Sequence, residues 1–174
     1  LTHRVRWNDQ LTSQARLGTS EDRLEDPGLA GGYPFLIYIR NIQSEAQVEI
    51  DHGDVQEAFG LQILREEERH AKMNHQTTAG VFGEGRVQLP RDGSAVATLR
   101  VDQRRSEFEK GEEVPTYRLT AFQPLVGGFS LRGSYGIAHR YAGFSELYDP
   151  WVGNSLLRAE KSRSREGGIA WISE

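Results

Sequence analysis

Residues 128–137 read G-F-S-L-R-G-S-Y-G-I, and this segment constrains the fold more than any other. Its large apolar side chains share one parity: Phe129, Leu131, Tyr135 and Ile137. Serine, arginine and glycine fill the other parity. Because successive side chains of a β-strand point to opposite faces, this pattern predicts a strand with one apolar and one polar face. We expect the apolar face to point into a core, together with Ile63, Leu99 and Leu119.

The same alternation recurs along the chain, with turn residues between the alternating segments. The segments that show it are 5–7, 15–17, 47–50, 59–63, 86–89, 95–101, 117–121 and 169–172. Residues 35–42 are β-prone on both faces, which is typical of a central strand. The sequence Pro90-Arg-Asp-Gly93 is a turn signal. Short strands at this spacing, without long helical patterns between them, predict an antiparallel sandwich or barrel.

Charged stretches interrupt the alternation, and we expect them to be connections. Residues 19–32 are acidic and then glycine-rich, which predicts a loop. Residues 66–74 predict one or two helical turns or a solvated loop. The basic stretch with Arg158, Lys161, Arg163 and Arg165 could contact phosphate or an acidic partner, but a solvated connection between two strands is favoured. No domain boundary is evident, so residues 1–174 are predicted to be one domain, with 1–32 preceding a body of 33–174.

Composition excludes several classes of protein. A net charge of −4 disfavours a nucleic-acid binder, which usually carries a basic face. No apolar run approaches the roughly 20 residues of a spanning helix, so we expect no membrane span. The chain has no cysteine, which removes disulfides and thiolate chemistry. Leu1 in place of methionine indicates a processed chain or a fragment.

Four local patterns carry a resemblance to a known family. Residues 34–41 read P-F-L-I-Y-I-R-N, residues 89–94 read L-P-R-D-G-S, residues 128–135 begin G-F-S-L and end in tyrosine, and residues 151–153 read W-V-G. In this order they resemble bacterial immunoglobulin-like β-sandwich domains. The resemblance departs from the family where Asp92-Gly93 replaces Pro-Gly and where Phe129 replaces tyrosine. It implies a single antiparallel β-sandwich with long loops, in an extracytoplasmic interaction or spacer module.

An aromatic loop at residues 141–151 is the main candidate site. Tyr141, Tyr148, Asp149 and Trp151 offer flat apolar faces beside a carboxylate. Such groups anchor protein interfaces or stack on sugar rings. The alternative is that the aromatic side chains only cap the core.

Other candidates for chemistry are weaker. Glu66, Glu67, Glu68, His70 and His75 lie close in sequence but lack the spacing of a metal site, so we predict no metal. Residues 128–132 fail the G-x-S-x-G pattern of hydrolases at the last glycine, and no phosphate-binding loop is present.

These observations predict a non-catalytic module of a bacterial envelope or secreted protein, without a cofactor. It would recognise a protein partner through its end loops or a sheet edge. The alternatives are a carbohydrate-binding module that uses Tyr148 and Trp151, and a small β-sheet enzyme with a site assembled from loops.

Overall fold

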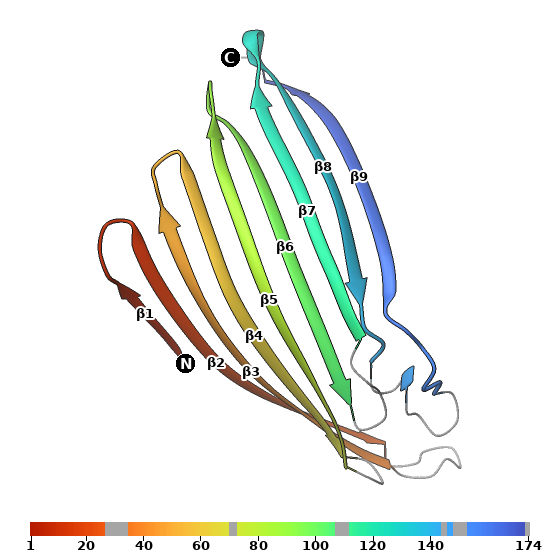
Figure 1. Cartoon of the computed structure of the whole chain (residues 1–174). Coiled ribbons are helices and arrows are strands. Elements are labelled where there is room, and N and C mark those ends of the chain that lie inside the picture. Colours follow the sequence, from red (N-terminus) through yellow and green to blue (C-terminus); the bar gives the residue numbers. More distant parts are fainter. Residues whose placement is uncertain (27–34, 70–72, 107–111, 144–145, 148–152, 173–174) are drawn as a thin grey trace.

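A computed structural model gives the fold of the chain (Figure 1). It describes residues 1–26, 35–69, 73–106, 112–143, 146–147 and 153–172. These residues form nine strands: β1 (Thr2–Arg6), β2 (Leu11–Asp26), β3 (Phe35–Asp51), β4 (Val55–Arg69), β5 (Met73–Leu89), β6 (Gly93–Ser106), β7 (Glu112–Pro124), β8 (Phe129–Arg140) and β9 (Glu160–Trp171). A short 3₁₀ turn, η2 (Val126–Gly128), precedes β8. No helix in the described ranges is long and apolar enough to cross a membrane.

All nine strands belong to one antiparallel sheet, in which each strand pairs only with its neighbours in sequence. The sheet is a curved surface with β1 and β9 at its two edges (Figure 1). The prediction of an all-β antiparallel fold is therefore confirmed. The prediction of a sandwich is wrong, because the described strands form a single sheet and not two packed sheets.

Tight turns join the strands at one end of the sheet. In the turn between β1 and β2, the Asn8 side-chain oxygen accepts hydrogen bonds from the backbone N–H groups of Gln10 and Leu11, each at 2.8 Å. In the predicted turn at 90–93, Arg91 and Asp92 have φ values of 60° and 59°. Two successive positive φ angles are typical of the type I′ turn, whose twist matches that of paired strands. This end of the sheet is called the short-turn end below.

Three charged stretches that were predicted to be connections are instead parts of strands. Residues 19–26 belong to β2, residues 66–69 to β4, and residues 160–165 to β9. Each keeps its register with a neighbouring strand, as in the pairs Glu21 with Arg40 and Lys161 with His139. The backbone ladder holds these residues extended although their side chains are charged, because the hydrogen bonds of a strand do not depend on its side chains.

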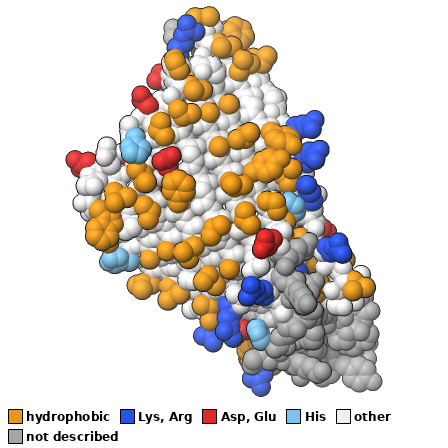
Figure 2. Space-filling view, viewed as in Figure 1, with side chains coloured by type: hydrophobic (Ala, Val, Ile, Leu, Met, Phe, Trp, Pro, Cys, Tyr) orange, Lys and Arg blue, Asp and Glu red, His pale blue; other side chains and the backbone are white. Residues whose placement is uncertain are grey.

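The register places most of the apolar side chains on one face of the sheet, here called the apolar face, although some, such as Leu64, Phe82 and Phe122, lie on the other face. Leu61 on β4 pairs with Val81 on β5, which pairs with Val101 on β6. Figure 2 shows this face, where hydrophobic side chains cover most of the strands. The predicted alternation is thus correct for the middle of the strands, such as residues 129–137 and 95–101.

The apolar face is not a core. Leu61 is 49% exposed, Leu99 is 56% exposed and Leu131 is 42% exposed, since no second layer of protein covers them. Ile137 is buried, as predicted, but Phe129, Leu119 and Ile63 are exposed. A soluble protein rarely leaves so large an apolar surface uncovered, so this face requires an apolar environment outside the described chain.

Candidate functional site

The opposite face of the sheet, here called the polar face, carries a chain of polar contacts that crosses five strands. Glu45 on β3 lies 3.6 Å from Arg16 on β2 and accepts a hydrogen bond from Gln62 on β4 at 3.2 Å. Gln62 in turn accepts a hydrogen bond from Arg100 on β6 at 2.7 Å. Arg100 also binds Asp102, with a shortest distance of 2.6 Å. The polar face is therefore built from paired charges and amides.

Two glycines make room for these side chains. A Cβ atom at Gly80 on β5 would overlap the Asp102 carboxylate and the Arg100 guanidinium, which lie over its backbone. A Cβ atom at Gly60 on β4 would overlap the ring of Phe82. Glycine at these positions lets side chains of a neighbouring strand lie across the sheet.

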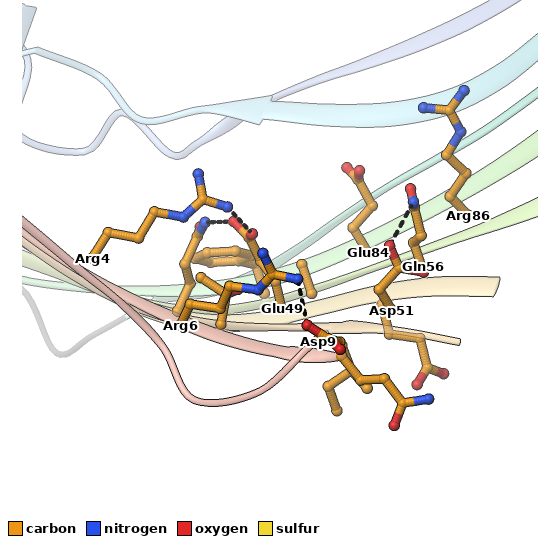
Figure 3. Close-up of a pocket in the computed structure, with 15 residues that line it drawn as sticks. Arg4, Arg6, Asp9, Glu49, Asp51, Gln56, Glu84 and Arg86 are labelled. Carbon is orange, nitrogen blue, oxygen red and sulfur yellow. Dashed lines mark hydrogen bonds and ion pairs between the residues drawn. The ribbon is translucent and has the colours of Figure 1, made fainter. Parts of the chain in front are cut away.

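A polar cavity of about 910 Å³ lies on the polar face near the short-turn end (Figure 3). Arg4 binds Glu49 at 2.9 Å, and Arg6 binds Asp9 at 2.8 Å. Further charged side chains in its lining are Asp51, Glu84 and Arg86. The labelled side chains extend from the strands toward the same space (Figure 3). A cavity that offers both signs of charge suits polar or charged groups better than an apolar ligand.

At the other end of the sheet, the start of the connection between β8 and β9 packs on Arg104. Arg104 is 2% exposed, donates a hydrogen bond to the Ala142 carbonyl at 2.7 Å, and lies 4.6 Å from the centre of the Tyr141 ring. Tyr141 donates its hydroxyl proton to the carbonyl oxygen of Asp102 at 3.0 Å. Ala142 and Leu147 are buried. Tyr141 and Ala142 therefore pack against the polar face.

An ion pair fixes the same segment. Both terminal nitrogens of Arg140 bind the Glu146 carboxylate at 2.9 Å, and the backbone N–H of Gly143 donates to it at 2.7 Å. The hydrogen bonds from Arg140 and from Gly143 stabilise the charged carboxylate and lower the pKa of Glu146 to about 2. Glu146 is therefore ionised at every physiological pH.

Aromatic side chains collect on the apolar face at the short-turn end. Trp7 donates from its indole nitrogen to the Ser13 hydroxyl at 2.9 Å, and Trp171 donates to the Gly127 carbonyl at 3.1 Å. The rings of Phe129 and Trp171 lie 6.3 Å apart. All three aromatic residues are exposed.

The predicted aromatic site is only partly described by the structure. Tyr141 packs on β6, as given above, whereas Tyr148, Asp149 and Trp151 lie outside the described residues. Their assignment as partner-binding residues stays a prediction.

The predicted histidine and carboxylate cluster is divided between the two faces. Glu66 accepts a hydrogen bond from Gln76 on the polar face. Glu67 lies on the apolar face, where it is opposite His75 in the strand register and forms an ion pair with Arg65 at 2.8 Å. His70 lies outside the described residues. Within the described ranges, no three His, Asp or Glu side chains lie close enough to hold a metal ion.

Sequence reasoning missed the polar face as a site. Its members alternate with apolar residues, as in Gln43, Glu45, Gln47 and Glu49 of β3. The signal was present, because the same parity carries polar and charged groups on every strand. Polar residues at this spacing are equally typical of the solvated face of an antiparallel sheet, so the pattern alone does not identify a site.

Several solved structures are similar to this chain. The copper transporter OprC matches with a TM-score of 0.69 and 13% identity, over 94% of this chain and 33% of that chain. The outer-membrane protein OmpT of Vibrio cholerae matches in two forms. One has a TM-score of 0.57 and 12% identity, over 75% of this chain and 41% of that chain. The trimer form has a TM-score of 0.59 and 13% identity, over 93% of this chain and 51% of that chain. This chain thus spans between a third and a half of these proteins.

The family comparison overturns the resemblance to immunoglobulin-like domains. Residues 7–173 match the model of the TonB dependent receptor-like β-barrel. The fold of OmpT, an outer-membrane protein, agrees with this family and not with a sandwich domain. The prediction of an immunoglobulin-like interaction module is therefore wrong. The prediction of an extracytoplasmic, bacterial envelope location is confirmed. The chain belongs to the family of TonB-dependent receptor-like β-barrels.

Proposed function

We propose that this chain forms part of the wall of an outer-membrane transport barrel, with its apolar face against lipid and its polar face toward the lumen. The observation that carries the proposal is the division of one sheet into two faces. Leu61 and Leu99 are exposed on one side, and the Glu45–Gln62–Arg100 contacts lie on the other. Strands of membrane barrels alternate in this way between lipid and lumen.

The height of the apolar face fits a bilayer. On β5 the outward positions from Ala79 to Leu89 are alanine, valine, glycine or leucine, and the next outward positions are Thr77 and His75. The uncharged part of β5 therefore runs from Ala79 to Leu89, whereas β4 carries one outward carboxylate, Glu57, at the same height. Tilted strands of about 9–11 residues cross the hydrocarbon layer, so this segment is long enough to span it.

The aromatic residues fit one boundary of that layer. Trp7, Phe129 and Trp171 lie at the short-turn end of the apolar face. Aromatic girdles flank the apolar band of membrane barrels at both interfaces, where an indole N–H finds polar partners. Short turns face the periplasm in such barrels and longer loops face outward. We therefore place the short-turn end at the periplasm.

This orientation assigns partners to the two ends. A TonB-type coupling protein would act from the periplasmic side, and the transported ligand would enter from the outside. The role is transport and not catalysis. In this arrangement the predicted contacts of Tyr141, Tyr148, Asp149 and Trp151 would be made to the incoming ligand, because they lie in the connection between β8 and β9 at the external end.

Single cysteines test this placement, because residues 1–174 contain none. Four variants of the full-length receptor probe four environments: Leu61→Cys on the apolar face, Thr98→Cys on the polar face, Asp54→Cys in a short turn and Asn154→Cys in the long connection. Intact cells expressing each variant are treated with a maleimide that does not cross membranes, before and after the outer membrane is permeabilised.

We expect Asn154→Cys to react in intact cells and Asp54→Cys to react only after permeabilisation. Leu61→Cys should react with a lipid-soluble maleimide but not with the impermeant reagent. Equal reactivity of Leu61→Cys and Thr98→Cys toward the impermeant reagent would contradict the assignment of the two faces. Labelling of Asp54→Cys in intact cells would reverse the orientation.

A further inference from the structure

Three oxygen-bearing side chains lie beside one another on the polar face, at the end of the sheet opposite the short-turn end. The register places Asn41 on β3 opposite Glu66 on β4, and Glu66 opposite Gln76 on β5. Side chains that are directly opposite each other on one face of an antiparallel pair have Cβ atoms about 5 Å apart. The Glu66 carboxylate is therefore flanked by an amide on each side.

Gln76 holds its amide against this carboxylate. The residue is 3% exposed, and its Nε2 donates a hydrogen bond to a Glu66 carboxylate oxygen at 2.6 Å. The amide oxygen is bonded to the same carbon as that nitrogen, so it also lies beside the carboxylate. This oxygen is buried and accepts no hydrogen bond. Reversing the amide would set its oxygen against the Glu66 oxygen, which can only accept, so the hydrogen bond fixes the orientation of Gln76.

Asn41 repeats this pattern on the β3 side. Its Nδ2 lies 3.4 Å from the Ser20 hydroxyl oxygen on β2, whereas its Oδ1 is buried and accepts no hydrogen bond. Buried polar atoms are nearly always satisfied by protein, by water or by an ion. One water molecule has two hydrogens and no charge, whereas a cation binds several oxygens at once and neutralises the carboxylate between them. The three side chains therefore suit a cation.

The charge of Glu66 distinguishes it from other carboxylates of the polar face. Glu49 forms an ion pair with Arg4 at 2.9 Å, and Asp102 forms one with Arg100 at 2.6 Å. Among the described residues, Glu66 forms no ion pair with an arginine or lysine, and it accepts its hydrogen bond from a neutral amide. A half-buried carboxylate beside two buried acceptor oxygens thus lacks the positive charge that its counterparts have.

We propose that Asn41, Glu66 and Gln76 bind a calcium ion through one carboxylate and two amide oxygens. Calcium takes about 6–8 oxygen ligands, among them carboxylates, side-chain amide oxygens and water, and it tolerates irregular geometry. This donor set differs from a cluster of three His, Asp or Glu side chains, of which the described residues hold none. A single carboxylate gives weak binding, with a Kd of about 0.1–1 mM, as in extracellular calcium modules.

A bound ion would join β3, β4 and β5 near one end of the sheet. That this end faces the external medium rests on the proposed function, whereas the donor set itself does not.

The test titrates the full-length receptor, in a non-ionic detergent, with calcium chloride in an isothermal calorimeter. Glu66→Gln removes the charge, and Gln76→Leu removes an amide oxygen at similar side-chain volume. Glu84→Gln and Gln43→Leu are the matched controls, because they make the same changes at exposed positions of the polar face, on β5 and β3. Since each variant is compared with the parent, calcium bound elsewhere on the receptor cancels.

We expect the parent to bind one calcium ion more than Glu66→Gln, and Gln76→Leu to weaken that site at least ten-fold. The two controls should change its Kd by less than two-fold. Equal calcium binding by the parent and Glu66→Gln would overturn the site and leave water as the partner of the two amide oxygens. Binding of methylammonium chloride in place of calcium would overturn it as well.

Asn41→Leu is a second variant for the case in which Glu66→Gln does not fold. Unchanged calcium binding in both Asn41→Leu and Gln76→Leu then contradicts the proposal. Insertion into lipid vesicles, measured separately, tests the membrane placement. A receptor that binds calcium at these residues but does not insert overturns the proposed function alone, whereas one that inserts without this calcium site overturns the present inference alone.

Discussion

Arg100 on β6 donates a hydrogen bond to Gln62 on β4 at 2.7 Å, across the strand that lies between them. The contact is possible because Gly80 on β5 has no side chain to block it. The polar face is therefore held together by contacts between strands that are not themselves paired. The glycine at position 80 of β5 therefore permits the hydrogen bond between Arg100 on β6 and Gln62 on β4.

Gly80→Ala is expected to displace Arg100 and Asp102 and to lower the free energy of unfolding by about 1–3 kcal/mol, the usual cost of breaking partly buried polar contacts. Urea unfolding of the receptor in lipid vesicles, followed by tryptophan fluorescence, measures the change. Gly85→Ala on the same strand is the control, because a Cβ atom there meets nothing within 4 Å. Equal effects of the two substitutions would contradict the role of Gly80.

Leu61→Arg should lower stability by about 2–4 kcal/mol, because an outward arginine near the bilayer midplane loses its hydration. Thr120→Arg on the polar face should change stability by much less, since that side faces the aqueous lumen. Reversible unfolding in vesicles compares the two variants. A smaller cost for Leu61→Arg than for Thr120→Arg would mean that the lipid and lumen faces are interchanged.

Trp171 should lie at the periplasmic boundary of the bilayer. Residues 1–174 contain three tryptophans, so Trp7→Phe and Trp151→Phe leave Trp171 as the only one among them. The signal of Trp171 is the difference between this variant and the same variant with Trp171→Phe. Lipids brominated near the headgroup should quench its fluorescence more strongly than lipids brominated near the chain ends, since indole rings collect at the interface. Strongest quenching by the deep bromines would move Trp171 out of the proposed girdle.

The alternation of apolar and polar side chains was predictable from the sequence, as residues 129–137 show. What covers the apolar side was not, because a strand that packs on a second sheet and a strand that faces lipid have the same period of two. Leu131 illustrates the difference. Its parity predicts a side chain that points into a core, but Leu131 is 42% exposed on the apolar face.

The charged ends of the strands were missed for a related reason. Residues 19–26 and 160–165 have the composition of loops, yet they continue β2 and β9. Their backbone is held by neighbouring strands. In the proposed arrangement residues 19–26 of β2 extend above the bilayer, where charged side chains are solvated. Composition alone cannot distinguish such an extension from a connection. The polar site on the inner face was missed because it comes together only when five strands are aligned.

The Glu146 carboxyl should titrate with a midpoint of about 2, below its ordinary value of 4.5. Because the pKa of the folded state is lowered, the ion pair with Arg140 stabilises the segment fully above pH 4.5 and is lost as the pH falls through about 2. Carbon-13 NMR of the carboxyl group measures the midpoint. Arg140→Gln should return it toward 4.5.

Glu160→Gln is the control for that titration, because it removes the second carboxylate bound by Arg140 and leaves the pair with Glu146 in place. Its Glu146 midpoint should remain near 2. An unchanged midpoint in Arg140→Gln would show that Gly143 and not Arg140 determines the acidity of Glu146.

Since every strand pairs only with the strand before and the strand after it, the order of synthesis is also the order in space. Two consecutive strands and their tight turn are then a unit that can be duplicated or deleted in a gene without changing the partners of the remaining strands, apart from one new junction. A barrel built in this way can change its circumference, and with it the size of the solute it admits, by steps of one hairpin.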